Sequence, residues 1–114
     1  MIRARIAMPE TASAGESIEV KTLVSHPMES GFRFDNSGEA IPRNIISKFE
    51  VIYMGEVAFS VKFGPGIAAN PFLGFYLTLE NSGLVEFVWT EQDGEVTRMS
   101  RDVLIDGAVA DSET

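Results

Sequence analysis

The stretch Ile45–Phe63, "IISKFEVIYMGEVAFSVKF", decides the fold class. In its first half Phe49, Val51 and Tyr53 alternate with polar residues. A period of two puts successive side chains on opposite faces of a strand, so one face of this run is apolar. Met54-Gly55 interrupts the pattern, and the second half repeats it with Val57, Phe59, Val61 and Phe63. The stretch therefore predicts two neighbouring β-strands joined by a turn.

The same period of two recurs through most of the chain. In Ser17–Ser25 it places Ile18 and Val20 on one face. Trp89 falls in another alternating run and is predicted to lie in the core, while Asp93-Gly94 is a strong hairpin signal. No segment shows a convincing amphipathic helix. The pattern predicts an all-β domain over residues 1–104, an antiparallel β-sandwich of about seven strands, followed by an acidic tail over 105–114.

The composition excludes several classes of function. The net charge of −8, from 17 acidic and 9 basic residues, argues against nucleic acid as a partner, because phosphates are neutralised by clustered Lys and Arg. No apolar run approaches the roughly 20 residues of a membrane helix. There is no cysteine, which removes disulfides, thiolate nucleophiles, iron–sulfur clusters and thiolate zinc sites.

His26 is the one histidine and therefore the first candidate for catalysis. A catalytic or metal-binding role needs partners, and the nearby Glu29 makes only an isolated His-x-x-Glu pair in a connection. His26-Pro27 also marks the end of a strand, because the residue before proline prefers extended geometry. We interpret His26 as a structural or interface residue. A small metal-dependent enzyme that uses His26 and carboxylates is kept as an alternative.

Two connections carry apolar residues that suggest a partner surface. Residues 28–43 form a long connection, and connections longer than about 12 residues are uncommon without a role. Residues 64–72 form a second apolar, uncharged connection, for which a buried crossover between sheets is the alternative. The predicted interface residues are His26, Met28, Phe32, Phe34, Ile41, Ile67, Asn70 and Phe72.

Four segments in order, "KTLVSHPMESG", "IPRNIISKFEV", "AANPFLGFYL" and "FVWTEQDG", resemble the SoxZ family of the sulfur-oxidation (Sox) carrier complex. The resemblance runs from about residue 11 to residue 99, and its segments are specific in combination. It implies an immunoglobulin-like β-sandwich with no catalytic residue, no cofactor and no metal. It also implies a SoxY-like partner, whose C-terminal cysteine carries sulfur intermediates of thiosulfate oxidation. Without cysteine this chain cannot carry that sulfur itself and would be the scaffold subunit.

The resemblance also bears on location and further partners. The start "MIRARIAMPE" lacks the apolar region of a secretory signal and by itself indicates the cytoplasm or export by some other means. The family instead implies a periplasmic protein that is exported together with SoxY and makes transient contacts with other Sox enzymes. Homo-oligomers are expected to form when the partner is missing. A carrier subunit of another pathway and an unrelated adhesion or chaperone-like sandwich are the remaining alternatives.

Overall fold

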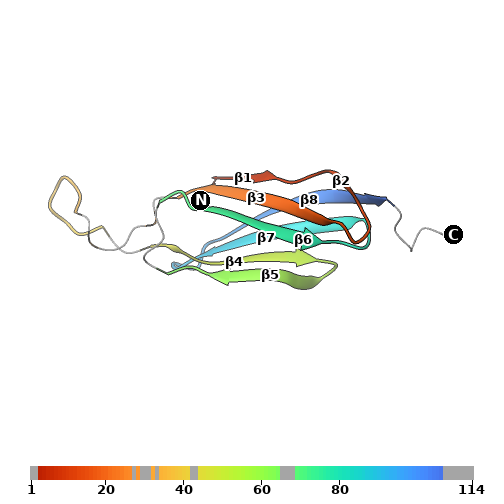
Figure 1. Ribbon diagram of the computed structural model, residues 1–114. Helices are drawn as coiled ribbons and strands as arrows, with labels where there is room; N and C mark the ends of the chain where they lie inside the picture. Colours follow the sequence, from red (N-terminus) through yellow and green to blue (C-terminus); the bar gives the residue numbers. More distant parts are fainter. Residues whose placement is uncertain are drawn as a thin grey trace.

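The computed structural model describes residues 3–26, 28, 32, 34–41, 44–64 and 69–106, and in these ranges the regular structure is all β (Figure 1). Ile67 and residues 107–114 of the predicted tail lie outside the described residues. No helix that could span a membrane occurs within the described ranges. The strands are β1 (Arg3–Ala7), β2 (Thr11–Ser13), β3 (Ser17–Ser25), β4 (Ile46–Tyr53), β5 (Glu56–Lys62), β6 (Phe72–Thr78), β7 (Gly83–Glu91) and β8 (Val96–Asp106).

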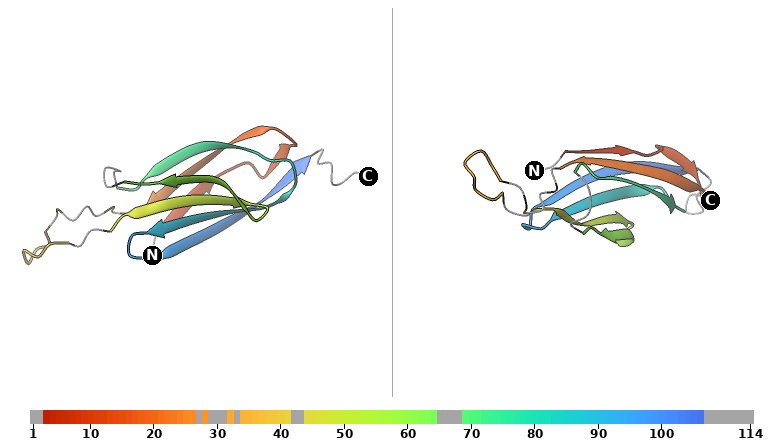
Figure 2. Two further views of the ribbon diagram at one scale, coloured as in Figure 1. Left: turned by 90° about the horizontal axis from the view of Figure 1, so that it is seen from below. Right: turned by 60° about the vertical axis from the view of Figure 1, so that its left-hand side comes forward.

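The strands form two sheets that stack as layers (Figure 2). One sheet has the order β1-β3-β6, and the other has the order β2-β8-β7-β4-β5. All neighbouring strands are antiparallel except the pair β2–β8, which is parallel. The predicted all-β sandwich is confirmed, with one strand more than the seven expected.

The additional strand is β2, and the chain passes from one sheet to the other between β1 and β2. β1 belongs to the three-stranded sheet, and after Pro9 the chain crosses to the edge of the five-stranded sheet. There Leu104 donates its N–H to the carbonyl of Glu10 at 2.9 Å, and Ala14 donates to Asp106 at 3.0 Å. The sequence Thr-Ala-Ser shows no apolar alternation, so only the pairing with β8 makes this segment a strand.

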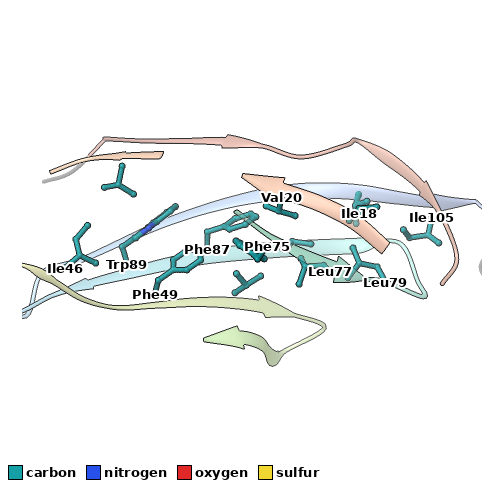
Figure 3. Close-up of a cluster of buried hydrophobic side chains, with 14 of the residues drawn as sticks. Ile18, Val20, Ile46, Phe49, Phe75, Leu77, Leu79, Phe87, Trp89 and Ile105 are labelled. Carbon is teal, nitrogen blue, oxygen red and sulfur yellow. The ribbon is translucent and has the colours of Figure 1, made fainter. Parts of the chain in front are cut away.

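The core lies between the sheets and is centred on aromatic rings (Figure 3). Phe49 of β4 is fully buried, and its ring centroid lies 5.0 Å from that of Trp89 and 5.9 Å from that of Phe75. Phe59 and Phe87 complete the cluster at 6.3 and 6.4 Å from Phe49. Trp89 is 1% exposed, which confirms its predicted place in the core. The strands facing each other supply the rings, so the cluster joins both sheets.

Two tight turns confirm the hairpins that the sequence predicts. Met54 and Gly55 connect β4 to β5, and both have positive φ angles, 56° and 78°. Two successive left-handed residues are typical of the type I′ turn, whose twist matches that of the strands. Asp93-Gly94 connects β7 to β8, with φ of 97° at Gly94. This second hairpin brings the end of β7 beside the connection that follows β3.

Candidate partner-binding end of the sandwich

His26 follows β3 and is almost fully buried, with 3% of its surface exposed. Its Nε2 lies 2.8 Å from Glu91 Oε1, and its Nδ1 accepts the backbone N–H of Met28 at 2.9 Å. Because Nδ1 accepts a hydrogen bond, the hydrogen-bond pattern assigns the ring proton to Nε2, which donates it to Glu91. Both ring nitrogens are used inside the chain. The arrangement favours a structural role over the metal-dependent alternative.

Glu91 receives this hydrogen bond at the end of β7, where 5% of the residue is exposed. Its Oε1 also accepts the side-chain amide of Asn44 at 3.1 Å, and Asn44 Oδ1 accepts the N–H of Asp93 at 3.2 Å. Glu91 Oε2 is buried and has no hydrogen-bond partner among the described residues. A buried carboxylate is costly unless hydrogen bonds replace its water. The network therefore ties together the end of β3, the chain before β4 and the β7–β8 turn.

Carboxylates of Glu91, Asp93 and Glu95 also approach one another at this turn, with oxygens within 4.8 Å. Asp93 and Glu95 are exposed, and Asp93 Oδ1 accepts the N–H of Glu95 at 2.9 Å. This hydrogen bond is a local one within the turn. The geometry of the β7–β8 turn places these carboxylates close together, and we assign no metal site to them.

Asn70 connects His26 to the second candidate connection. The Asn70 side-chain Oδ1 accepts the N–H of His26 at 2.9 Å, and the Asn70 N–H donates to the His26 carbonyl at 2.7 Å. The backbone of Asn70 is left-handed, with φ of 54°. Asparagine tolerates this conformation better than most residues, which explains its presence here. The chain before β6 is therefore fixed to the end of β3.

Replacing Asn70 with alanine is expected to lower the free energy of unfolding by about 1–3 kcal/mol, because the side-chain acceptor is lost and alanine is strained at positive φ. Urea denaturation followed by tryptophan fluorescence measures the change. Asn70→Gly is the control, since glycine removes the acceptor without the strain. It should lose less stability than Asn70→Ala, and an equal loss would refute the contribution of the backbone conformation.

Met28 anchors the beginning of the long connection in the core. It is 6% exposed, and its sulfur accepts the backbone N–H of Ile46 at 3.3 Å. Its φ angle of 53° is left-handed. Such a conformation persists in a residue with a side chain only when its surroundings hold it. The His26 ring and β4 supply those contacts.

Residues 34–41 of the same connection project beyond the end of the strands (Figures 1 and 2). Asp35 Oδ1 accepts the N–H groups of Ser37 and Glu39 at 2.8 and 3.0 Å, and Asp35 donates its own N–H to the Glu39 carbonyl at 2.8 Å. Phe34 and Ala40 form an isolated antiparallel bridge. The projecting turn therefore has its own hydrogen bonds although it lies outside the core.

The predicted interface residues divide into a buried and an exposed group. His26 and Met28 face the interior and contact each other, and His26 is bonded to Asn70. Phe32 and Phe34 are 85% and 68% exposed. The other described members are Ile41, which is half-buried, and Phe72, which is 61% exposed on β6. Exposed aromatic residues gathered at one end are typical of a contact surface, and their role remains a prediction.

Sequence reasoning missed Glu91 and Asn44, although a signal for Glu91 exists. In β7 the inward positions are every second residue, Val85, Phe87 and Trp89, and the next is Glu91. A carboxylate at an inward position requires a hydrogen-bonding partner, and the single histidine was available. Asn44 carries no comparable signal, since it lies just before β4 in a connection.

Solved structures define the class to which this fold belongs, the immunoglobulin-like β-sandwich. The superoxide reductase (neelaredoxin) from Ignicoccus hospitalis has a TM-score of 0.68 at 20% identity, covering 90% of this chain and 80% of that one. The sulfur carrier protein SoxY from Chlorobium limicola has a TM-score of 0.60 at 15% identity, covering 89% of this chain and 73% of that one. A CARDB domain from Pyrococcus furiosus has a TM-score of 0.51 at 17% identity, covering 92% of this chain and 87% of that one. At these identities the likeness concerns the fold.

The family follows from the sequence itself. Residues 5–102 match the family of the sulphur oxidation protein SoxZ, which is most of the chain. This chain belongs to the SoxZ family and is thus a subunit of the Sox sulfur-carrier type. Among curated proteins none is significantly similar in sequence.

Proposed function

We propose that this chain is the non-catalytic scaffold subunit of a SoxYZ-type sulfur carrier, paired with a SoxY-like subunit whose cysteine holds the sulfur intermediates of thiosulfate oxidation. One observation carries this proposal: the chain belongs to the SoxZ family and has no cysteine among its 114 residues. Covalent attachment of sulfur to a side chain requires a thiolate. The sulfur must therefore be attached to the partner, and this chain contributes binding.

The contact with SoxY is proposed to use the end of the sandwich from which the long connection projects. Stable complexes bury about 1,200–2,000 Å² in total, and aromatic residues are enriched at the centre of such interfaces. Phe32 and Phe34 are the most exposed aromatic residues among those described at this end. The buried contacts of His26 and Met28 fix the base of their connection. A pre-ordered base reduces the entropy lost on binding.

Co-expression with the SoxY-like subunit of the same organism tests this proposal. Size-exclusion chromatography with light scattering is expected to show a one-to-one complex. Changing Phe32 and Phe34 together to serine should raise the dissociation constant by about 10–100-fold, as expected for the loss of aromatic anchors. Isothermal titration calorimetry measures this change.

A matched control removes two exposed apolar side chains elsewhere. Leu84 and Leu104 are 46% and 65% exposed on the five-stranded sheet, and changing both to serine should leave the dissociation constant unchanged. Separate elution of the two wild-type proteins at micromolar concentration would contradict the proposed pairing. An equal loss of affinity in both double variants would contradict only the assignment of the binding surface.

The proposal includes a periplasmic location reached by export in complex with SoxY. Fractionation of cells that produce both subunits should recover this chain in the periplasm. When the SoxY-like subunit lacks its export signal, the chain should stay in the cytoplasm. Periplasmic recovery without an exported partner would refute the co-export route and leave the pairing untouched.

A further inference from the structure

β1 has one edge that pairs with no strand among the described residues. It pairs with β3 on one side only, because it is the outermost strand of the order β1-β3-β6, and Figure 1 shows it, in red, at the margin of the sandwich. Alternate N–H and C=O groups of an edge strand point outward without a ladder partner. This edge can therefore accept a further strand.

A hollow lies beside that edge, where the two sheets separate. Its volume is about 460 Å³, and its lining consists of Arg3, Ala4 and Arg5 from β1 with Thr97 and Met99 from β8. A second hollow of about 310 Å³ reaches the outer face of the sheet. It is lined by Arg3, Arg5, Leu23, Val24, Ser25 and Asn70. The two arginines line both hollows, and Ala4 and Met99 add apolar side chains to the first of them.

The charge of this face opposes that of the whole chain. Arg3 and Arg5 are exposed, and neither has an ion pair or a side-chain hydrogen bond with the described residues. Among the outward-facing residues of β1, β3 and β6 the only acid is Glu19, which lies 3.9 Å from Lys21. Two unpaired arginines in a chain of net charge −8 form a local positive site, which favours an anionic partner.

We propose that the outer edge of β1 binds an extended acidic segment of a partner polypeptide by strand addition. Side chains two residues apart on a strand share a face and lie roughly 7 Å apart. Two acidic residues with this spacing would face Arg3 and Arg5, and the residue between them would point inward beside Ala4 and Met99. The segment is therefore expected to have the pattern acidic–apolar–acidic.

The shape of the site favours a polypeptide over a small inorganic anion. A site for a small anion surrounds it with buried donors, whereas both arginines here are exposed. Between the two arginines the first hollow is lined by Ala4 and Met99, which offer contacts to an apolar side chain. Strand addition uses the backbone of the edge for affinity and the side-chain positions for selectivity.

Titration of the isotope-labelled full chain with an acetylated, amidated peptide Thr-Glu-Val-Glu-Val-Thr tests the proposal by NMR. Chemical-shift changes are expected at Ala4, Thr97 and Met99. Changing Arg3 and Arg5 together to glutamate should weaken binding by at least about 10-fold, and Arg3→Gln with Arg5→Gln should weaken it less. Replacing both peptide glutamates with lysine should abolish binding.

The matched control is Lys48→Glu with Lys62→Glu, which makes the same change of charge on β4 and β5, at the opposite edge of the other sheet. It should leave peptide affinity within about twofold of wild type, because exposed charges at a distance are screened by salt. An equal loss in both pairs would refute the site and indicate general electrostatic attraction. Shift changes confined to other strands, or full displacement of the peptide by millimolar sulfate, would also overturn the proposal. None of these results depends on the SoxY pairing.

Discussion

Replacing Phe49 with alanine is expected to destabilise the chain by about 3–5 kcal/mol, the cost of deleting a large aromatic side chain from a packed core. Phe49 is fully buried, and four aromatic rings lie around it on both sheets. The surrounding strands are fixed by their ladders and cannot close the resulting cavity. Chemical denaturation followed by circular dichroism measures the loss.

Phe72→Ala is the matched control, because Phe72 carries the same side chain in a strand and is 61% exposed. It is expected to change the free energy of unfolding by less than about 1 kcal/mol. A loss of similar size in both variants would show that the aromatic cluster is not the centre of stability. A loss below about 1 kcal/mol for Phe49→Ala would contradict the packing that we describe.

Replacing Glu91 with alanine is expected to cost about 2–4 kcal/mol, because it leaves the His26 Nε2–H and the Asn44 amide without their shared acceptor. Both donors bond to Glu91 Oε1. The change should also loosen the base of the projecting connection. Thermal unfolding gives the stability, and hydrogen exchange of the Met28 and Asn70 amides reports the local effect.

Glu91→Gln separates the role of the acceptor from that of the charge. Glutamine keeps one oxygen for His26 and places an NH₂ group where Oε2 has no partner among the described residues. We therefore expect an intermediate loss of stability. Glu56→Ala, at an exposed position of β5, is the control and should be nearly neutral. Unchanged amide exchange at Met28 in Glu91→Ala would refute the connection between the network and the loop.

The sequence is sufficient to predict the sandwich because its alternation is strong where strands face the core. Phe49 and Trp89 are examples, since their inward positions follow from parity alone. The turn at Met54-Gly55 was predictable because it interrupts the alternation, and the turn at Asp93-Gly94 was predictable because Asp-Gly is a common hairpin dipeptide. β2 was not predictable, because its identity as a strand depends on pairing with β8 from the far end of the chain.

The candidate site was only partly predictable for a related reason. The sequence places His26 at the end of a strand and Phe32 and Phe34 in a connection, and the structure agrees with both positions. It does not show that His26 and Met28 are buried, because their burial depends on Glu91, 65 positions away, and on β4. Exposure in a connection is set by tertiary contacts, and period-two patterns do not report them.

The parallel pairing of β2 with β8 has a consequence for synthesis. Thr11 pairs with Leu104 and Ser13 with Asp106, so about 90 residues separate the partners and the entropy of closing so long a loop opposes early pairing. During translation the β4–β5 and β7–β8 hairpins can form as soon as they emerge, whereas β2 must wait until its last partner residue is made. In a nascent chain of this protein, β2 therefore has no partner strand until Leu104–Asp106 have been made.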